Sequence, residues 1–208
     1  MIMLIIVATG LIIIGVQLCL RIFMFLDREN GLLFESRDML ILGLGSVMAA
    51  IVWGYTTADM KPEMCAVWLM IHILFLSCSV TDYQTYQVYD VFQYVGIGLT
   101  GYLVFSVTTY LWQGVSLVLF ALLQKFVFMR LYGKADGMIF LTAAMAETSL
   151  GGDISVYLFH MIISYLLVSA VQGIKGNIRK NGRLAQPVAF FPYITFGFWI
   201  ILLIKDYV

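Results

Sequence analysis

The stretch Met64–Asp82 reads MCAVWLMIHILFLSCSVTD, an uncharged apolar run that ends on an aspartate. A run of about 20 mostly apolar residues is long enough to cross the hydrocarbon core of a bilayer as a helix. Similar runs recur along the whole chain, which is 62% hydrophobic and only 12% charged. This composition excludes a soluble domain and predicts an all-α fold, a polytopic transmembrane helix bundle.

Hydropathy divides the chain into about eight membrane segments. Their expected boundaries are 1–20, 39–58, 64–81, 91–111, 115–132, 137–150, 154–174 and 188–204. The uncharged run 91–124 is too long for one span, and Trp112-Gln113-Gly114 supplies a turn signal that divides it. We expect one transmembrane domain over 1–208, with two N-terminal helices in 1–63 and a core in 64–204.

Lysine and arginine predict the orientation, because cytoplasmic loops of membrane proteins carry an excess of both. With the N-terminus outside, one face receives Arg21, Arg28, Arg37, Lys125, Arg130, Lys134, Lys175, Arg179, Lys180 and Arg183. The other face receives only Lys61 and Lys205. The first face is therefore expected in the cytoplasm, and the protein in the cytoplasmic membrane.

Two aspartates, Asp82 and Asp136, then fall at the cytoplasmic ends of spans that are distant in sequence and free to pack side by side. An aspartate there is costly unless it is solvated, paired or used in chemistry. Two neighbouring carboxyls can share one proton, so that one accepts a proton from water while the other donates. That arrangement favours aspartic proteolysis. The alternative is that Asp136 caps a helix whose starting turn contains Gly133 and Ala135.

Three motifs together resemble the type IV prepilin peptidase and preflagellin peptidase family, which are membrane aspartic peptidases of the GxGD type. In that family the first catalytic aspartate closes a helix and precedes an Ile-Pro-Asp/Asn triplet, matched here by Asp82 and by Val88-Tyr89-Asp90. The second ends a Gly-x-Gly/Ala-Asp motif, matched by Gly133, Ala135 and Asp136. The last helix resembles the family's Pro-Phe-x-Pro-Phe…Gly stretch at 189–197, with Pro192 and Gly197.

The resemblance implies an endopeptidase that removes the short cytoplasmic leader of a type IV prepilin-like precursor. Asp82 and Asp136 would be its catalytic residues, and no metal or organic cofactor is implied. The partners would be a precursor with a basic leader and an apolar helix, and the lipid bilayer. Tyr89 stands where the family has proline, and Met138 where it often has lysine.

The remaining polar residues have plainer interpretations. Asp90 either caps the next helix or contacts a basic leader. Glu147 lies near the outer end of a short segment, where solvation is enough to explain it, and His72 and His160 are expected to be hydrogen-bonded packing residues. No cluster has the spacing of metal ligands, and the neutral net charge gives no indication of nucleic-acid binding.

Two other functions remain open. A catalytically degenerate relative would keep the fold and act as a scaffold for pilus assembly. A small proton-coupled transporter would instead use ionisable groups spread through the depth of the membrane. Asp82 and Asp136 are expected at one face, which favours the peptidase over the transporter.

Overall fold

The computed structural model describes residues 2–26, 36–86, 88, 90–107, 110–130, 132–177 and 187–204, without the side chains of 23–26 and 36–41. Several residues on which the predictions rely lie outside this description: Arg28, Tyr89, Arg179, Lys180, Arg183 and Lys205, and the side chain of Arg37.

The described chain is helical throughout. Its helices are α1 (Ile2–Leu26), α2 (Ser36–Thr56), α3 (Pro62–Thr85), α4 (Asp90–Ser106), α5 (Leu111–Phe126), the short 3-10 helix η1 (Phe128–Arg130), α6 (Lys134–Thr148), α7 (Ile154–Ile174) and α8 (Phe191–Ile204). The all-α prediction is therefore confirmed, and every expected segment corresponds to a helix.

Length separates these helices into two groups. Four stretches are long and apolar enough to cross a membrane, namely Ile2–Ile22, Pro62–Thr85, Leu111–Arg130 and Ile154–Ile174. The apolar stretches Leu42–Thr56 and Phe191–Ile204 are shorter. At 1.5 Å per residue, α6 rises only about 22 Å, which is less than a hydrocarbon core of about 30 Å. Four membrane-spanning helices are thus supported by length and composition.

The break within the uncharged run 91–124 lies earlier than the sequence suggested. Helix α4 ends at Ser106 and α5 begins at Leu111, so Trp112-Gln113-Gly114 forms the first turn of α5 and not a loop. The backbone amide of Tyr110 donates to Gln113 Oε1 at 3.0 Å. Gln113, which the sequence suggested was part of a turn, thus caps α5, because its side chain accepts from a backbone amide that would otherwise be unpaired.

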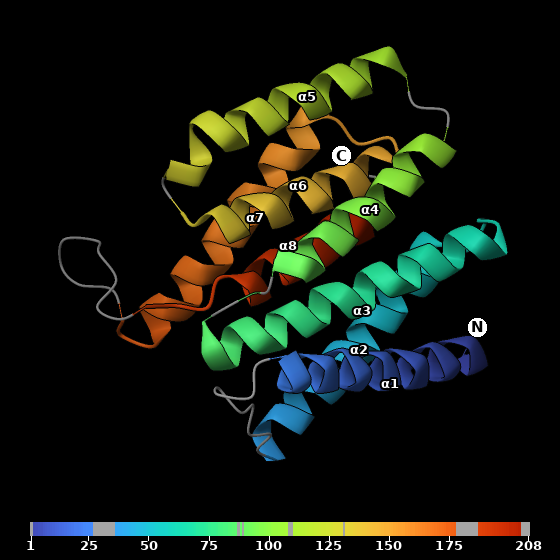
Figure 1. Ribbon diagram of the computed structural model, residues 1–208, viewed down its shortest axis with the longest axis vertical. Helices are drawn as coiled ribbons and strands as arrows, with labels where there is room; N and C mark the ends of the chain where they lie inside the picture. The colour runs from blue at the N-terminus through green and yellow to red at the C-terminus, as the bar shows by residue number, and fades with distance from the viewer. Residues whose placement is uncertain are drawn as a thin grey trace.

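Helices α3, α6 and α8 each pack against four other α-helices of the described chain (Figure 1). Helix α3 contacts α1, α2, α4 and α8, while α6 contacts α4, α5, α7 and α8. Gly96 of α4 lies against both Leu74 of α3 and Thr142 of α6, and Thr100 lies against Met145. Helices α4 and α6 therefore run parallel. The C-terminus of α3 lies at the same side of the bundle as the N-termini of α4, α6 and α8.

Candidate functional site

Asp82 lies in the last turn of α3, where the residue is only 9% exposed. The helix ends at Tyr86, whose amide donates to the Asp82 carbonyl at 2.9 Å and whose φ of 55° places it in the left-handed region. A residue other than glycine rarely adopts that conformation, which costs about 1–2 kcal/mol. The chain thus turns sharply at Tyr86, four residues after Asp82, and α3 extends beyond the end at residue 81 that hydropathy predicted.

The start of α8 binds the Asp82 carboxyl. The backbone amide of Phe191 donates to Asp82 Oδ2 at 2.8 Å, and the backbone of Phe190 also hydrogen-bonds to this carboxyl. Phe191 is the first residue of α8, and the amides of a first helical turn lack partners within their own helix. A carboxylate is a favourable partner for such amides, because the positive end of the helix dipole is also there.

Asp136 lies in the first turn of α6 and is half-buried. The N-cap residue of α6 is Gly133, so the alternative was wrong in assigning that position to Asp136. Asp136 is the third residue of the helix, and its side chain still supports the helix start, because it points back and hydrogen-bonds to the backbone of Gly133. This leaves Asp136 fixed in orientation at the start of α6, with part of its surface open.

Asp82 and Asp136 lie within electrostatic range of each other, at the end of the bundle where α3 ends and α6 begins. Their helices do not pack side by side as expected. Among the described residues, α3 and α6 make no direct contact, and α4 and α8 contact both. Each carboxyl is bound to backbone groups, and at this range the charge of one acts on the other.

Aromatic side chains surround Asp136 and the start of α8. Tyr132 and Tyr165 both lie within electrostatic range of Asp136. The rings of Tyr132, Tyr165 and Phe190 pack against one another, with the Phe190 centroid 6.4 Å from Tyr132 and 5.1 Å from Tyr165 and the two tyrosines 6.1 Å apart. Phe190 thus contacts both halves of the site, because its backbone bonds to Asp82 while its ring packs beside the tyrosines near Asp136.

The other predicted site residues occupy supporting positions. Asp90 is exposed and begins α4, near the level of Asp136. Pro192 follows Phe191 in the first turn of α8, where proline is well tolerated. Gly197 is buried against α7, and a methyl group there would lie 2.4 Å from Ser164 Oγ. Gly197 therefore permits the close approach of α7 and α8, about 9 Å along α8 from the amide that binds Asp82.

A groove of about 840 Å³ lies beside the Asp82 end of α3. Its walls come from α2, α3, α8 and the end of α7, and include Leu44, Met48, Leu76, Tyr83, Phe196 and Lys175. Ser79, one turn before Asp82, lines the groove and hydrogen-bonds to Thr195 of α8 at 2.7 Å. The groove is therefore mostly apolar, with polar and basic groups at the end nearest the aspartates.

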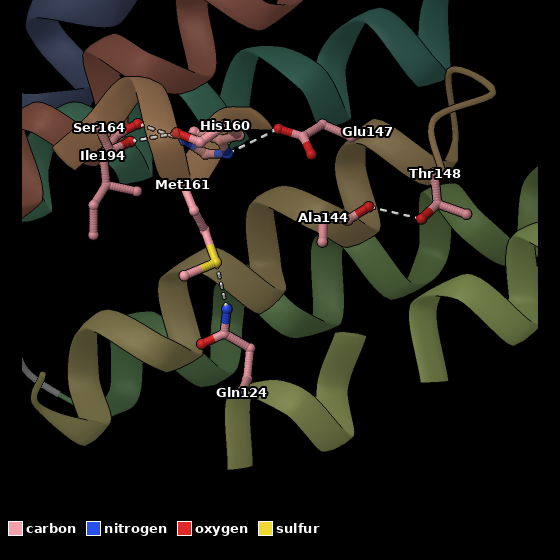
Figure 2. A network of polar contacts seen from close by, with 8 residues as sticks. All are labelled: Gln124, Ala144, Glu147, Thr148, His160, Met161, Ser164 and Ile194. Carbon is pink, nitrogen blue, oxygen red and sulfur yellow. Dashed lines mark hydrogen bonds and ion pairs between the residues drawn. The ribbon is translucent and has the colours of Figure 1, made fainter. Parts of the chain in front are cut away.

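The sequence interpretation missed one polar cluster (Figure 2). Glu147, expected to be solvated, is buried at the end of α6 and lies 2.9 Å from His160 Nδ1. His160 and His72 are buried and hydrogen-bonded as expected, to the Ile194 carbonyl and to Trp199 respectively. The sequence spacing of Glu147 and His160 gave no indication of their contact, because this contact depends on how α7 packs against α6.

Comparisons of the chain with protein-family models, with curated proteins and with solved structures found no match.

Proposed function

We propose that this protein is a membrane aspartic endopeptidase that removes a short leader from a prepilin-like precursor. The observation that carries the proposal is the approach of Asp82 and Asp136 to within electrostatic range at one end of the bundle. Further support comes from the resemblance of the surrounding motifs to the prepilin and preflagellin peptidase family. The positive-inside distribution of lysine and arginine favours the cytoplasmic face for this end.

The proposed reaction uses the two carboxyls as one unit. The ionised carboxyl takes a proton from a water molecule, whose oxygen attacks the scissile carbonyl carbon. The protonated carboxyl stabilises the developing oxyanion and then gives its proton to the leaving amide nitrogen as the carbon–nitrogen bond breaks. The backbone groups of Phe191 and Gly133 keep the two side chains oriented during this exchange.

The groove beside α3 offers a place for the substrate. Its apolar wall suits the apolar helix of a precursor, and its polar end lies next to the aspartates. A leader that extends from that end would pass the exposed carboxylate of Asp90 at the start of α4. The carboxylate of Asp90 would be a favourable contact for a basic leader.

Cleavage of purified candidate precursors by the protein in lipid vesicles tests the proposal. The wild type should shorten a precursor that carries a basic leader, and Asp82→Asn or Asp136→Asn should abolish the product. Asp59→Asn is the matched control, because Asp59 is an exposed carboxylate in the turn before α3, at its opposite end from Asp82. Cleavage that survives in either site variant would exclude the aspartic mechanism.

The buried pair Glu147–His160 favours a second candidate, a proton-coupled transporter. A transporter requires ionisable groups at more than one depth, and Glu147 lies about 16 Å along α6 from Asp136. Proton uptake into vesicles that contain the protein separates the two functions. If the protein is a proton-coupled transporter, the pH inside the vesicles should change when a gradient of its substrate is imposed. A peptidase would leave this pH unchanged.

A further inference from the structure

Helix α4 lies between the two helices that carry the aspartates. Helices α3 and α6 make no direct contact among the described residues, and α4 packs against both. A methyl group at Gly96 would lie 2.8 Å from Leu74 of α3 and 3.1 Å from Thr142 of α6. Buried residues recur about once a turn on this face of α4. They are Phe92, Gln93, Gly96, Thr100 and Leu103.

Gln93 is the polar residue of this buried face nearest the aspartates. It lies three residues before Gly96. In the parallel helix α6, Asp136 lies six residues before Thr142, the neighbour of Gly96. At 1.5 Å per residue, Gln93 is thus about 4.5 Å short of the level of Asp136. Because the Cα–Cβ bonds of a helix lean toward its N-terminus, that of Gln93 leans toward the aspartate end.

The side-chain amide of Gln93 is buried without a partner. The residue is 3% exposed, and its Nε2 has no hydrogen-bond partner among the described residues. Two other buried glutamines are satisfied, because Gln124 Nε2 donates to Met161 Sδ at 3.2 Å and Gln172 Nε2 to the Tyr193 hydroxyl at 2.9 Å. A side-chain amide nitrogen only donates, and leaving it unpaired costs free energy. The group that completes the site at Gln93 is therefore a hydrogen-bond acceptor.

We propose that Gln93 binds a backbone carbonyl of the precursor, as a substrate-binding residue beside the two aspartates. A peptide that passes the carboxyls presents a carbonyl oxygen at every residue, and this oxygen accepts hydrogen bonds without bringing a charge into the bundle. The basic side chains of a leader carry donors only and cannot fill this position. The inference rests on the proposed peptidase function, and it assigns to α4 a part in holding the substrate while the first amide of α8 holds Asp82.

Binding of an uncleaved substrate tests this assignment. The probe is a synthetic peptide with a basic leader followed by an apolar helix, added to Asp136→Asn protein in lipid nanodiscs. In this background Gln93→Met keeps the length of the side chain and removes both donors. It should weaken binding of the peptide by about 2–10-fold, the effect of one lost hydrogen bond.

Gln113→Met is the matched control for this measurement. It makes the same change at a buried glutamine beside Gly151, at the opposite end of the bundle from the aspartates, and should leave peptide binding unchanged. Equal affinity of the peptide for the Gln93→Met and Gln113→Met proteins would overturn the proposal. A peptide that does not bind even the parent protein would contradict the proposed function, and this inference with it.

Melting temperatures separate substrate binding from support of the fold. Gln93→Met should melt no lower than its parent, because Gln93 Nε2 makes no hydrogen bond that the substitution could remove. Gln113→Met should melt lower, because Gln113 Oε1 accepts from the Tyr110 amide at 3.0 Å. A fall in both melting temperature and peptide affinity in Gln93→Met would show a structural role and would overturn the proposal.

Nitrogen NMR identifies the acceptor. The side-chain amide resonance of Gln93, recognised by its loss in Gln93→Met, should shift when the peptide is added to the Asp136→Asn protein. A resonance that stays in place while the peptide binds would show that a resident water fills the position, and would overturn the proposal.

Discussion

Individual side chains in this bundle are positioned by partners on other helices. Asp82 at the end of α3 is bound by the first amide of α8, and His160 on α7 is bound by a carbonyl of α8. Polar groups within an apolar bundle need such partners, because lipid offers none. Gly197 allows α7 and α8 to come close enough for these contacts.

Substitution of Gly197 by alanine tests this close approach. The added methyl group would lie 2.4 Å from Ser164 Oγ and 3.1 Å from His160 Cδ2, so the Ser164 and His160 side chains or the two helices must shift. We expect a loss of about 1–3 kcal/mol in stability, measured as a lower melting temperature in detergent. Gly98→Ala on α4 is the matched control, because a methyl group there meets nothing within 4 Å. Equal melting temperatures for the two variants would contradict the packing described.

The positions of Asp82 and Asp136 at one end of the bundle follow from hydropathy, because each aspartate borders an uncharged run and the runs alternate in direction. The environment of Glu147 could not be predicted in this way. Its sequence context near Gly151-Gly152 resembles an exposed helix end, and only the packing of α7 across α6 brings His160 to it. Contacts between helices depend on rotation about their axes, which a nearly uniform apolar sequence does not specify.

Helix ends in this protein are defined by specific caps. Asp153 caps α7, and its Oδ1 accepts from the amides of Ser155 and Val156 and from the Ser155 hydroxyl. Tyr110 and Gln113 form the corresponding cap of α5. These caps explain why α7 begins at the predicted residue while α5 begins earlier than predicted. Asp153 after two glycines is a strong start signal, whereas Gln113 was interpreted as part of a turn.

Removal of the α7 cap should destabilise the protein in a pH-dependent manner. The Ser155 hydroxyl and the backbone amides hold the pKa of Asp153 below its usual range. Because this pKa is lower in the folded state, the carboxylate stabilises the fold fully at any pH above its unfolded-state pKa of about 3.9. The stabilisation is lost as the pH falls through the folded-state pKa. Asp153→Ala should cost about 1 kcal/mol at pH 7.

The measurement for this cap is the difference in melting temperature between wild type and Asp153→Ala as the pH is lowered. The difference should shrink once the pH falls below about 4. Ser155→Ala keeps the Asp153 carboxylate but removes a hydrogen bond that lowers its pKa. In this variant the stabilisation by the Asp153 carboxylate should therefore fade at a higher pH than in the wild type. A difference that stays constant over the whole range would show that the charge of Asp153 does not act as the cap.

The two ends of the helix bundle carry different sets of ionisable side chains. One end carries Asp82, Asp136 and the exposed Asp90, and the other carries the buried Glu147–His160 pair with its cavity. Short helices such as α6 place both sites within one bundle, because α6 bears Asp136 in its first turn and Glu147 in its last. The proposed orientation puts the aspartates at the cytoplasmic face.

Single cysteines at the two ends test this orientation. Lys175→Cys at the end of α7 and Asp59→Cys in the turn before α3 are both exposed, and Cys19, Cys65 and Cys78 would first be replaced by serine. In intact cells an impermeant thiol reagent should label the cysteine at 59 and leave that at 175 unlabelled. The reverse pattern would place the aspartates outside, where a cytoplasmic leader cannot reach them.

The rate of precursor cleavage by the double variant Asp82→Asn/Asp136→Asn, compared with both single variants, tests the central claim most directly. Each single variant should lose about 10²–10⁴-fold in rate, because proton transfer by one carboxyl requires the other. The double variant should then be no slower than either single variant, since groups that act as a unit lose their effect together. Cleavage near the wild-type rate in one single variant, or losses that multiply in the double variant, would contradict a shared catalytic pair.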